Sequence, residues 1–439
     1  MERKISNIFK GDKVIWMVFF FLCIVSAVEV FSASSELTYK GGNYLAPMLK
    51  HIGILFVGVM LMVVTLNIQC KYFKIATPFL LALSVLTLLW VQVAGHSTNN
   101  ASRWLSLFGI QFQPSEIAKG ALVLATAQIL AATQTDRGAE PRAMKYIFGM
   151  ATPIVGLIML ENLSTAALLC VVLFLMMFVG RVPGRQMWRL VAVVVVGIIT
   201  MVSIIMIVGK DTEQDAQQQT LTEVVDQEGK HVQEQEEKSG GGIFHRFDTW
   251  KSRIDKFLDH KEISPNEVDL DKDAQTAHAN IAIASCNVIG KGPGNSVERD
   301  FLSQAFSDFI YAIIIEETGI EGAFFVALLY IILLFRAGRI ANRCDNNFPA
   351  FLAMGLALLL VTQALFNMCV AVGLVPVTGQ PLPLISKGGT SSIINCIYIG
   401  VILSISRSAK KNAKAKDKMM LKTATREENP QIVAETERI

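Results

Sequence analysis

Charged residues are scarce in this chain, and several common motifs are missing from it. Only 18% of the 439 residues are charged, whereas 52% are hydrophobic and the mean hydropathy is +0.44. This balance exceeds what a soluble core needs and places the chain in the membrane class. None of the seven cysteines forms a Cys-x-x-Cys pair, which argues against a zinc site or a disulfide framework. We also find no heptad run, no clear internal repeat and no segment typical of a soluble domain.

Long apolar runs, in contrast, are abundant. A helix needs about 20 apolar residues to cross the hydrocarbon core. Runs of this kind occupy 14–33, 46–67, 76–95, 114–133, 146–160, 164–180, 188–208, 309–335, 349–372 and 389–406. The first run is too long for a cleaved signal peptide and predicts a retained anchor. We therefore predict an all-α polytopic membrane protein with about ten transmembrane helices.

The fifth and sixth runs are short and are joined by "ENLSTA". They fit either a tight hairpin or one longer bent element, and the charge distribution favours the hairpin. Basic residues then gather in alternate connections, as the positive-inside rule requires for an even number of spans with both termini cytoplasmic. These basic groups are Arg3, Lys4, Lys10, Lys13; Lys71, Lys74; Arg137, Arg142, Lys145; Arg181, Arg185, Arg189; Arg336, Arg339, Arg343; and the tail from Arg407.

This topology divides the chain into five parts and places it in the cytoplasmic (inner) membrane. The predicted parts are a cytoplasmic N-terminus 1–13, helices one to seven within 14–208, a large extracytoplasmic loop 209–308 between helices 7 and 8, helices eight to ten within 309–406, and a basic cytoplasmic tail 407–439. We expect the tail to lack fixed structure and to be attracted to anionic lipid.

The large loop changes composition along its length. Residues 211–242 are acidic, rich in glutamine and end in glycines, which predicts a flexible insert. The stretch "FHRFDTWKSRIDKFLDH" has the apolar spacing of an amphipathic helix. The glycines of "GKGPGNS", 290–296, fit either close backbone contact with phosphate or a plain loop, and the stretch lacks the Lys-Ser ending of a P-loop.

Residues 99–124 form the first of three polar segments that face outward in this topology. Pro114 suits the first turn of a helix, and Glu116 suits its positive end. Lys119 follows Glu116 by three residues, so the two can pair. Inserting a lysine at that depth of the membrane costs about 2.5–3.5 kcal/mol of free energy. Lys119 therefore either forms an internal ion pair that only holds the helices together or faces a polar cavity. Arg103 beside Trp104 is either an interface anchor or an anion ligand.

The second polar segment is "GLVPVTGQPLPLISKGGTSS", 373–392. An irregular backbone at membrane depth is tolerated where it is buried in protein or lines a wet cavity. A tight surface turn is the alternative. Its polar and glycine positions are Thr378, Gln380, Ser386, Lys387, Gly388 and Gly389.

The third segment, "SDFIYAIIIEETGIEGA", carries three acids into an apolar run. Asp308 opens the run and is either functional or a helix N-cap, with Ser307 an equally good cap. Glu316 and Glu317 lie deeper, or on a half-embedded segment that ends at Gly319. Intramembrane acids are usually functional and paired with a cation, so a salt bridge to Lys119 or another bundle cation is the structural alternative for them.

Together these segments resemble the SEDS proteins, the family that contains FtsW and RodA. The similarity rests on "RW…QPSEIAKGALVL", on "GKGPGNS…FLSQAFSDFIYAIIIEETG" and on the C-terminal "GLVPVTGQPLPLISKGGTSS", in this order along nearly the whole chain. The chain departs from the family pattern where Asn162 replaces an acid, where Ser164 replaces a glycine and where Lys387 replaces the usual tyrosine.

The resemblance implies a glycosyltransferase that polymerises lipid II, an undecaprenyl-diphosphate-linked precursor, into peptidoglycan at the outer face of the membrane. It implies a class B penicillin-binding protein and other division proteins as partners, with no nucleic-acid partner. It also implies that Asp308 is the essential outer-loop aspartate. The expected substrate- or diphosphate-binding residues are Arg103, Lys119, Lys387, Glu116, Thr378, Gln380 and Ser386, of which Arg103, Lys119 and Lys387 are the candidate partners of the diphosphate. Glu316, Glu317, Gly388 and Gly389 are expected to have structural or supporting roles.

No cofactor is certain from the sequence, and a divalent cation (Mg or Mn) held by Asp308 is one option. A lipid II flippase and a non-catalytic scaffold are the competing functions. Within the family, the segments favour a division protein like FtsW over an elongation protein like RodA.

Overall fold

The structure is a computed structural model that describes residues 10–33, 45–94, 96–98, 101–107, 110–208, 274–286, 288–302 and 307–428. The predicted insert 211–242 and the predicted amphipathic helix "FHRFDTWKSRIDKFLDH" lie outside the described residues. The helices are α2 Lys13–Ala33, α4 Leu45–Asn67, α5 Cys70–Ala94, α6 Pro114–Ala132, α7 Arg142–Glu161, α8 Leu163–Val179, α9 Gly184–Val208, α12 Ala274–Ala284, α13 Ile310–Ala341, α14 Asn347–Ala371 and α15 Thr390–Glu428, with a short 3-10 helix η1 Glu298–Asp300.

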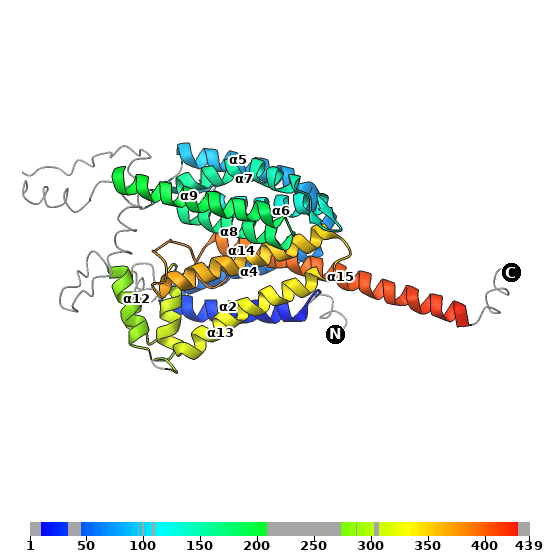
Figure 1. The fold of residues 1–439 in the computed structure, drawn as a ribbon. Coiled ribbons are helices and arrows are strands. Elements are labelled where there is room, and N and C mark those ends of the chain that lie inside the picture. Colours follow the sequence, from blue (N-terminus) through cyan, green and yellow to red (C-terminus); the bar gives the residue numbers. More distant parts are fainter. Residues whose placement is uncertain are drawn as a thin grey trace, which may run out of the picture.

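Each of the ten predicted spans coincides with one of these helices, which form an elongated bundle (Figure 1). Eight helices of the described chain are long and apolar enough to cross a membrane, namely α2, α4, α5, α6, α7, α13, α14 and α15. Helix α8 is apolar but has only 17 residues, and α9 is not among the eight. The polytopic helical fold is confirmed, and the count of ten spans stays a prediction.

Two small sheets interrupt the helices. Strands β1 His96–Thr98, β2 Ala101–Leu107 and β3 Ile110–Phe112 form an antiparallel sheet, and β4 Gln134–Thr135 pairs with β5 Gly138–Ala139. The first sheet pairs His96 with Trp104 and Leu105 with Phe112, so the polar connection between α5 and α6 is folded rather than loose. It leads directly into α6, which begins at Pro114 as predicted.

Helix α14 lies in the interior of the bundle. It packs against α13, α6, α8 and α15. About 67% of its span is buried by protein, compared with 28% for α5 and for α7. Its side chains are therefore well placed to connect segments that lie far apart in the sequence.

Hydrogen bonds fix which residues share an end of the bundle. At one end, the Arg336 guanidinium pairs with Asp12, and Arg407 Nη1 donates to Asn67 Oδ1 at 3.0 Å. At the other end, the Ser32 hydroxyl donates to Glu317. Helices α2 and α13 are thus antiparallel neighbours, as the predicted alternation of loops requires.

Helix α13 is divided, and α15 is longer than expected. Gly319 has a non-helical backbone (φ 72°, ψ −172°), so a short helical segment precedes the long span. This agrees with the alternative in which Glu316 and Glu317 lie on a separate segment that ends at Gly319. Helix α15 continues to Glu428 and projects beyond the bundle (Figure 1), which corrects the expectation that the tail lacks structure from Arg407 onward.

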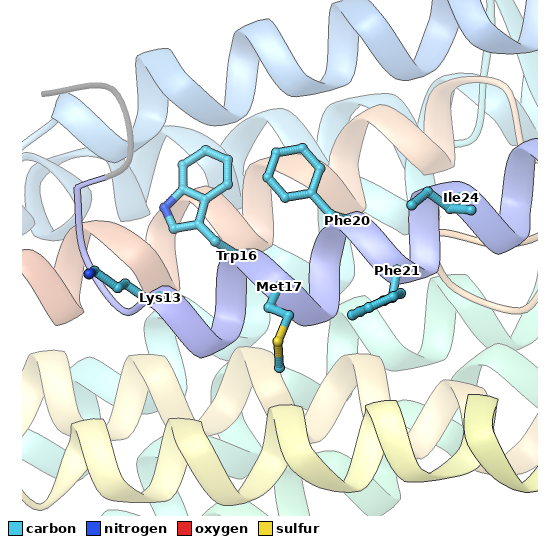
Figure 2. Close-up of a pocket in the computed structure, with 6 residues that line it drawn as sticks. All are labelled: Lys13, Trp16, Met17, Phe20, Phe21 and Ile24. Atoms are coloured by element: carbon cyan, nitrogen blue, oxygen red, sulfur yellow. The ribbon is translucent and has the colours of Figure 1, made fainter. Parts of the chain in front are cut away.

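A pocket of about 420 Å³ opens on α2. It is lined by Lys13, Trp16, Met17, Phe20, Phe21 and Ile24 (Figure 2). The Trp16 and Phe20 rings stack there, with their centroids 5.7 Å apart. No predicted site residue lines this apolar pocket.

Candidate functional site

Asp308 lies where the large loop ends and α13 begins. Ser307 and Asp308 form a turn, and both are partly exposed. The Ser307 hydroxyl donates to Asp308 Oδ1 at 3.0 Å. The N-cap of α13 is Phe309, with no side-chain cap, so Asp308 does not serve as the predicted alternative cap. Because Phe309 is buried, the carboxylate lies at the boundary between the packed bundle and its surface.

Two side chains hold the backbone around Asp308. Ser386 Oγ donates to the Ser307 carbonyl at 2.6 Å. Asn367 Nδ2, from α14, donates to the Asp308 carbonyl at 2.8 Å and also to the Gln380 carbonyl at 2.8 Å. The sequence places these residues in three distant segments, and the fold joins them at one point.

The C-terminal segment 373–389 is folded into the bundle, which excludes the surface-turn alternative. Gln363 Nε2 donates to the Pro381 carbonyl at 3.0 Å, and Gln380 Nε2 donates to Thr165 Oγ1 at 2.7 Å. Thr378, Gln380 and Ser386 are all buried. The irregular backbone is tolerated because side chains of neighbouring helices satisfy its polar groups.

Lys119 forms the predicted pair with Glu116. Its ammonium donates to Glu116 Oε1 at 2.8 Å and to Gln363 Oε1 at 2.8 Å. The Lys119 side chain is 0% exposed, and Glu116 Oε2 is buried without a hydrogen-bond partner. Through Gln363, this ion pair is tied to the same C-terminal segment that contacts Ser307. The charge of Lys119 therefore acts inside the protein rather than at an exposed surface.

The remaining positions of the C-terminal segment differ in their settings. Lys387 is half-buried. Burial, and to a smaller extent the nearby Lys50 ammonium, lower the pKa of Lys387. Thr378 Oγ1 is buried without a hydrogen-bond partner. Gly388 accepts from the Ser391 backbone at the start of α15, and Gly389 has a positive φ of 53°. The two glycines thus form the turn into α15, which fits their predicted supporting role.

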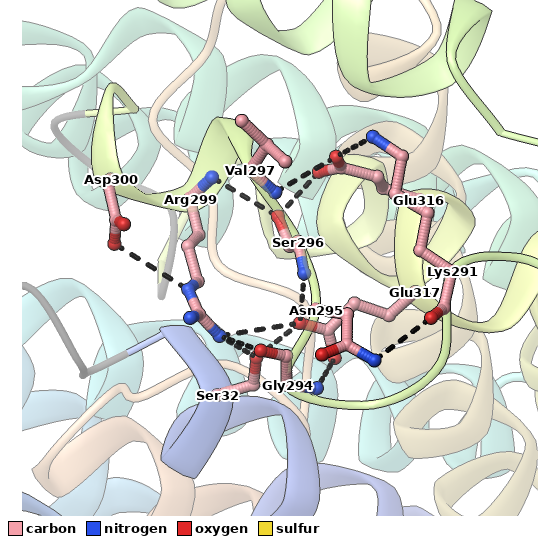
Figure 3. Close-up of polar contacts among 10 residues, drawn as sticks. All are labelled: Ser32, Lys291, Gly294, Asn295, Ser296, Val297, Arg299, Asp300, Glu316 and Glu317. Carbon is pink, nitrogen blue, oxygen red and sulfur yellow. Dashed lines mark hydrogen bonds and ion pairs between the residues drawn. The ribbon is translucent and has the colours of Figure 1, made fainter.

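Glu316 and Glu317 pair with cations of the large loop. Lys291 Nζ donates to Glu316 Oε1 at 2.6 Å, and Arg299 Nη1 lies 3.9 Å from Glu317 Oε1 (Figure 3). Their expected bundle partner Lys119 is instead occupied by Glu116. The physical reason is the break at Gly319, because it lets residues 290–299 fold back onto the end of the first helical segment.

Backbone donors complete this arrangement, which we call the loop clasp (residues 290–299 with Glu316, Glu317 and Ser32). The Gly294 amide donates to Glu317 Oε2 at 3.0 Å, and the Val297 amide donates to Glu316 Oε1 at 3.1 Å. The clasp uses the glycine-rich stretch to bind carboxylates of the same chain, so this stretch is a structural loop rather than a free phosphate-binding loop.

Glycine is required at the two points where the backbones meet in the loop clasp. A Cβ at Gly319 would lie 2.1 Å from the Val288 carbonyl oxygen, and a Cβ at Gly290 would lie 2.4 Å from the Glu317 carbonyl oxygen. Both glycines also have positive φ values, 72° and 78°. Any other residue would push the loop away from α13.

Arg103 lies on β2, but its side chain is outside the described part of the structure. Its predicted role stays a prediction. Asn162, which departs from the family pattern, is the N-cap of α8 and accepts from the Ser164 and Thr165 amides at 3.0 and 3.2 Å. This contact gives the substitution a structural role at the junction between α7 and α8.

A resident divalent cation would need a cluster of ligating side chains. Among the described residues, no group of three or more His, Cys, Asp or Glu side chains could hold a metal ion. The loop clasp already satisfies Glu316 and Glu317 with protein donors. The described residues therefore do not form a resident metal centre.

Sequence reasoning missed Gln363 and Asn367. These amides lie four residues apart on one face of α14, where they contact Lys119 and Asp308 respectively. The available signal was a pair of amides inside an otherwise apolar span, because such groups need partners in a membrane.

Comparisons with known proteins agree with this architecture. The sequence profile of the cell cycle protein family FtsW/RodA/SpoVE matches residues 12–233 and 242–411. The chain is 27% identical to the peptidoglycan glycosyltransferase MrdB of Escherichia coli K12 over 401 residues, covering 90% of this chain and 93% of MrdB. It is also 27% identical to the probable peptidoglycan glycosyltransferase FtsW of Aliivibrio salmonicida, covering 87% and 84%.

Solved structures share the fold. One is a chain from a structure on the coordination of polymerization and crosslinking by a peptidoglycan synthase complex, with a TM-score of 0.64, 22% identity and coverage of 91% of this chain and 98% of that one. Thermus thermophilus RodA gives a TM-score of 0.58 at 21% identity, with coverage of 92% and 99%. The extent of the profile match shows that the chain belongs to the FtsW/RodA/SpoVE family of cell cycle proteins.

Proposed function

We propose that this protein is a peptidoglycan glycosyltransferase that polymerises lipid II into glycan strands at the outer face of the cytoplasmic membrane. The single observation that carries the proposal is the convergence on Asp308, a partly exposed carboxylate whose backbone is held by Asn367 and Ser386 from two distant segments. Family membership and the names of the relatives support the same reaction class.

The reaction is a glycosyl transfer with a diphosphate leaving group. A bond forms between the acceptor sugar's 4-hydroxyl oxygen and the donor's anomeric carbon, while the bond from that carbon to the diphosphate oxygen breaks. The diphosphate leaves with the electron pair, and Asp308 accepts the hydroxyl proton. A positioned general base of this kind contributes a factor of about 10²–10⁴ to the rate.

Positive charge near the base stabilises the leaving diphosphate. The Ser386 hydroxyl donates to the Ser307 carbonyl, so Lys387 and Asp308 each directly follow one of two residues that are in contact. We therefore assign Lys387 as the direct diphosphate partner, with Arg103 as a second one. The buried ion pair of Lys119 and Glu116 acts as a positioning element through Gln363 and the C-terminal segment.

Membrane side and partners follow from charge and family. The end of the bundle with Arg336 and Arg407 is assigned to the cytoplasm by the positive-inside rule, which puts Asp308 at the opposite, outer end. The structural likeness to a chain of a peptidoglycan synthase complex supports a class B penicillin-binding protein as partner. The predicted septal role, with other division proteins, is tested by localising a fluorescent fusion to septum or sidewall.

The activity itself is tested with the full chain in vesicles that carry lipid II. Appearance of glycan polymer on a gel supports the proposal. Movement of labelled lipid II across the bilayer without any polymer would instead establish the flippase function and overturn the proposal. Absence of both activities, with the cognate penicillin-binding protein present, would favour the scaffold function.

A further inference from the structure

The bend that leads into the loop clasp exposes two apolar side chains. Val288 and Ile289 directly precede Gly290, and they are 59% and 79% exposed. A single exposed apolar residue is normal on any protein surface, so exposure alone identifies no partner. The surface that these two residues continue indicates which environment covers them.

The backbone of this bend lies against α13 at Gly319. A Cβ at Gly319 would lie 2.1 Å from the Val288 carbonyl oxygen, so no side chain separates the two backbones. The Lys291 amide donates to the Glu316 carbonyl at 3.0 Å, which holds the next part of the loop on the same helix. Val288 and Ile289 therefore lie beside the point where the long apolar part of α13 begins.

The part of α13 that follows Gly319 exposes an apolar stripe. Its members recur at the spacing of one helix face and are Ile320, Phe324, Leu328, Ile331 and Phe335. Helix α13 is long and apolar enough to cross a membrane, so an exposed apolar face on it contacts hydrocarbon. Val288 and Ile289 thus continue a lipid-facing surface rather than form an isolated patch.

The contact between α2 and α13 sets the depth of the bend. The apolar span of α2 ends at Ser32, and the Ser32 hydroxyl donates to Glu317. Gly319 follows Glu317 by two residues, so it lies near the level at which the apolar span of α2 ends. Phe31, next to Ser32, is also exposed. The bend therefore lies at the edge of the hydrocarbon core.

The cationic side chains of the same loop point into the loop clasp. Lys291 Nζ donates to Glu316 Oε1 at 2.6 Å, and Arg299 Nη1 donates to Ser32 Oγ at 3.0 Å (Figure 3). Lys291 Nζ also donates to Ser285 Oγ at 3.0 Å. The loop thus satisfies its cations within the protein and leaves aliphatic side chains outside. A segment in the membrane interface requires this division, because charge is costly in hydrocarbon and an aliphatic side chain is not.

We propose that Val288 and Ile289 insert into the hydrocarbon of the membrane leaflet at the Ser32–Glu317 end of the bundle, so that the loop clasp is anchored in the membrane. In the topology proposed above this is the outer leaflet. The occupant of the surface is the acyl-chain region of phospholipid. The inference does not depend on glycosyl transfer, since it concerns contact with lipid and involves no reaction.

Photocrosslinking of the full chain tests this contact. p-Benzoylphenylalanine (Bpa), whose excited ketone bonds to a nearby C–H group, is introduced as Ile289→Bpa, Phe324→Bpa or Asp300→Bpa. Phe324 lies on the lipid-facing stripe and is the positive control. Asp300 is an exposed, charged residue of the same loop and is the matched negative control. Each protein is irradiated in phosphatidylethanolamine–phosphatidylglycerol vesicles and in isolated cell membranes, and its intact mass is measured.

We expect Ile289→Bpa to gain the mass of a phospholipid, with a yield close to that of Phe324→Bpa and well above that of Asp300→Bpa. Fragmentation of the adduct should place the new bond on an acyl chain. Val288→Bpa should give the same adduct, so the result does not depend on the folding of one variant.

A lipid yield from Ile289→Bpa and Val288→Bpa no higher than that from Asp300→Bpa, while Phe324→Bpa is crosslinked, would overturn the inference. Bonds to the headgroup alone would also overturn it. An adduct with another protein in cell membranes would assign the surface to a protein partner instead. If the lipid adduct forms but the chain makes no glycan from lipid II, the proposed function fails while this inference stands.

Discussion

The side-chain amide of Asn367 donates a hydrogen bond to the backbone carbonyl of Asp308 across a distance of 2.8 Å. The two residues are 59 positions apart in sequence. Asn367 is almost fully buried on α14, whereas Asp308 is partly exposed. An interior helix therefore holds the backbone of the proposed base in position.

Asn367→Ala should reduce polymerisation by lowering kcat more than it changes KM. The substitution leaves the carbonyls of Asp308 and Gln380 without their shared donor, at a cost of about 1–3 kcal/mol per buried group. Steady-state kinetics on reconstituted protein measures the split. A variant with unchanged kcat would show that α14 does not position Asp308.

Glu316→Ala should lower the thermal midpoint in detergent, because it leaves Lys291 and the Val297 amide without their acceptor. Removing one partner of a buried ion pair costs about 3–5 kcal/mol, and the partial exposure of Lys291 places the expected loss at or below the lower bound. Glu321→Ala, an exposed acid on the same helix, is the matched control and should change little. Equal midpoints for both variants would contradict the loop clasp.

Lys119→Met should be strongly destabilising, because it leaves Glu116 as an unpaired buried charge. The double variant Glu116→Gln/Lys119→Met removes both charges and should recover most of the lost unfolding free energy. A double-mutant cycle by denaturant titration measures the coupling. If the two single effects simply add, the pair does not act as a unit.

Asp12 gives a pH dependence whose sign can be worked out. Burial raises the pKa of this carboxyl, but the hydrogen bond and charge of Arg336, together with hydrogen bonds from the Val14 and Ile15 amides, outweigh burial and hold the pKa below its ordinary value of 3.8. A depressed carboxyl pKa contributes stability above the unfolded value, and this contribution is lost as the pH falls through the folded pKa. Asp12→Asn should therefore be less stable than wild type at pH 7.

The same comparison at low pH provides the control. The difference between wild type and Asp12→Asn should shrink as the pH falls below 3.8. Thermal midpoints across the range from neutral to acid pH measure it. A constant difference at all pH values would mean that the charge of Asp12 does not contribute.

The sequence predicts the helices well and the site in part. Hydropathy alone locates the spans, because a lipid solvent forces long apolar helices. It also predicts the pair Glu116–Lys119, since the residues are three apart on one helix. The partners of Glu316 escape prediction, because Lys291 lies 25 residues away and meets it only through the break at Gly319.

Gln363 and Asn367 are not found by spacing for a similar reason. Each is an amide in a largely apolar helix, and its partner lies on a segment remote in sequence. Local periodicity contains no information about such contacts. What the sequence does contain is the need for a partner, because an amide at membrane depth is costly when unpaired.

The central claim is that Asp308 is the base for glycosyl transfer at the outer end of the bundle. The direct measurement is gel analysis of glycan formed from lipid II by wild type, Asp308→Asn and Asp300→Asn, an aspartate of the same loop, in vesicles with equal amounts of inserted protein. We expect polymer from wild type and Asp300→Asn and none from Asp308→Asn. Polymer from Asp308→Asn at the wild-type rate would contradict it.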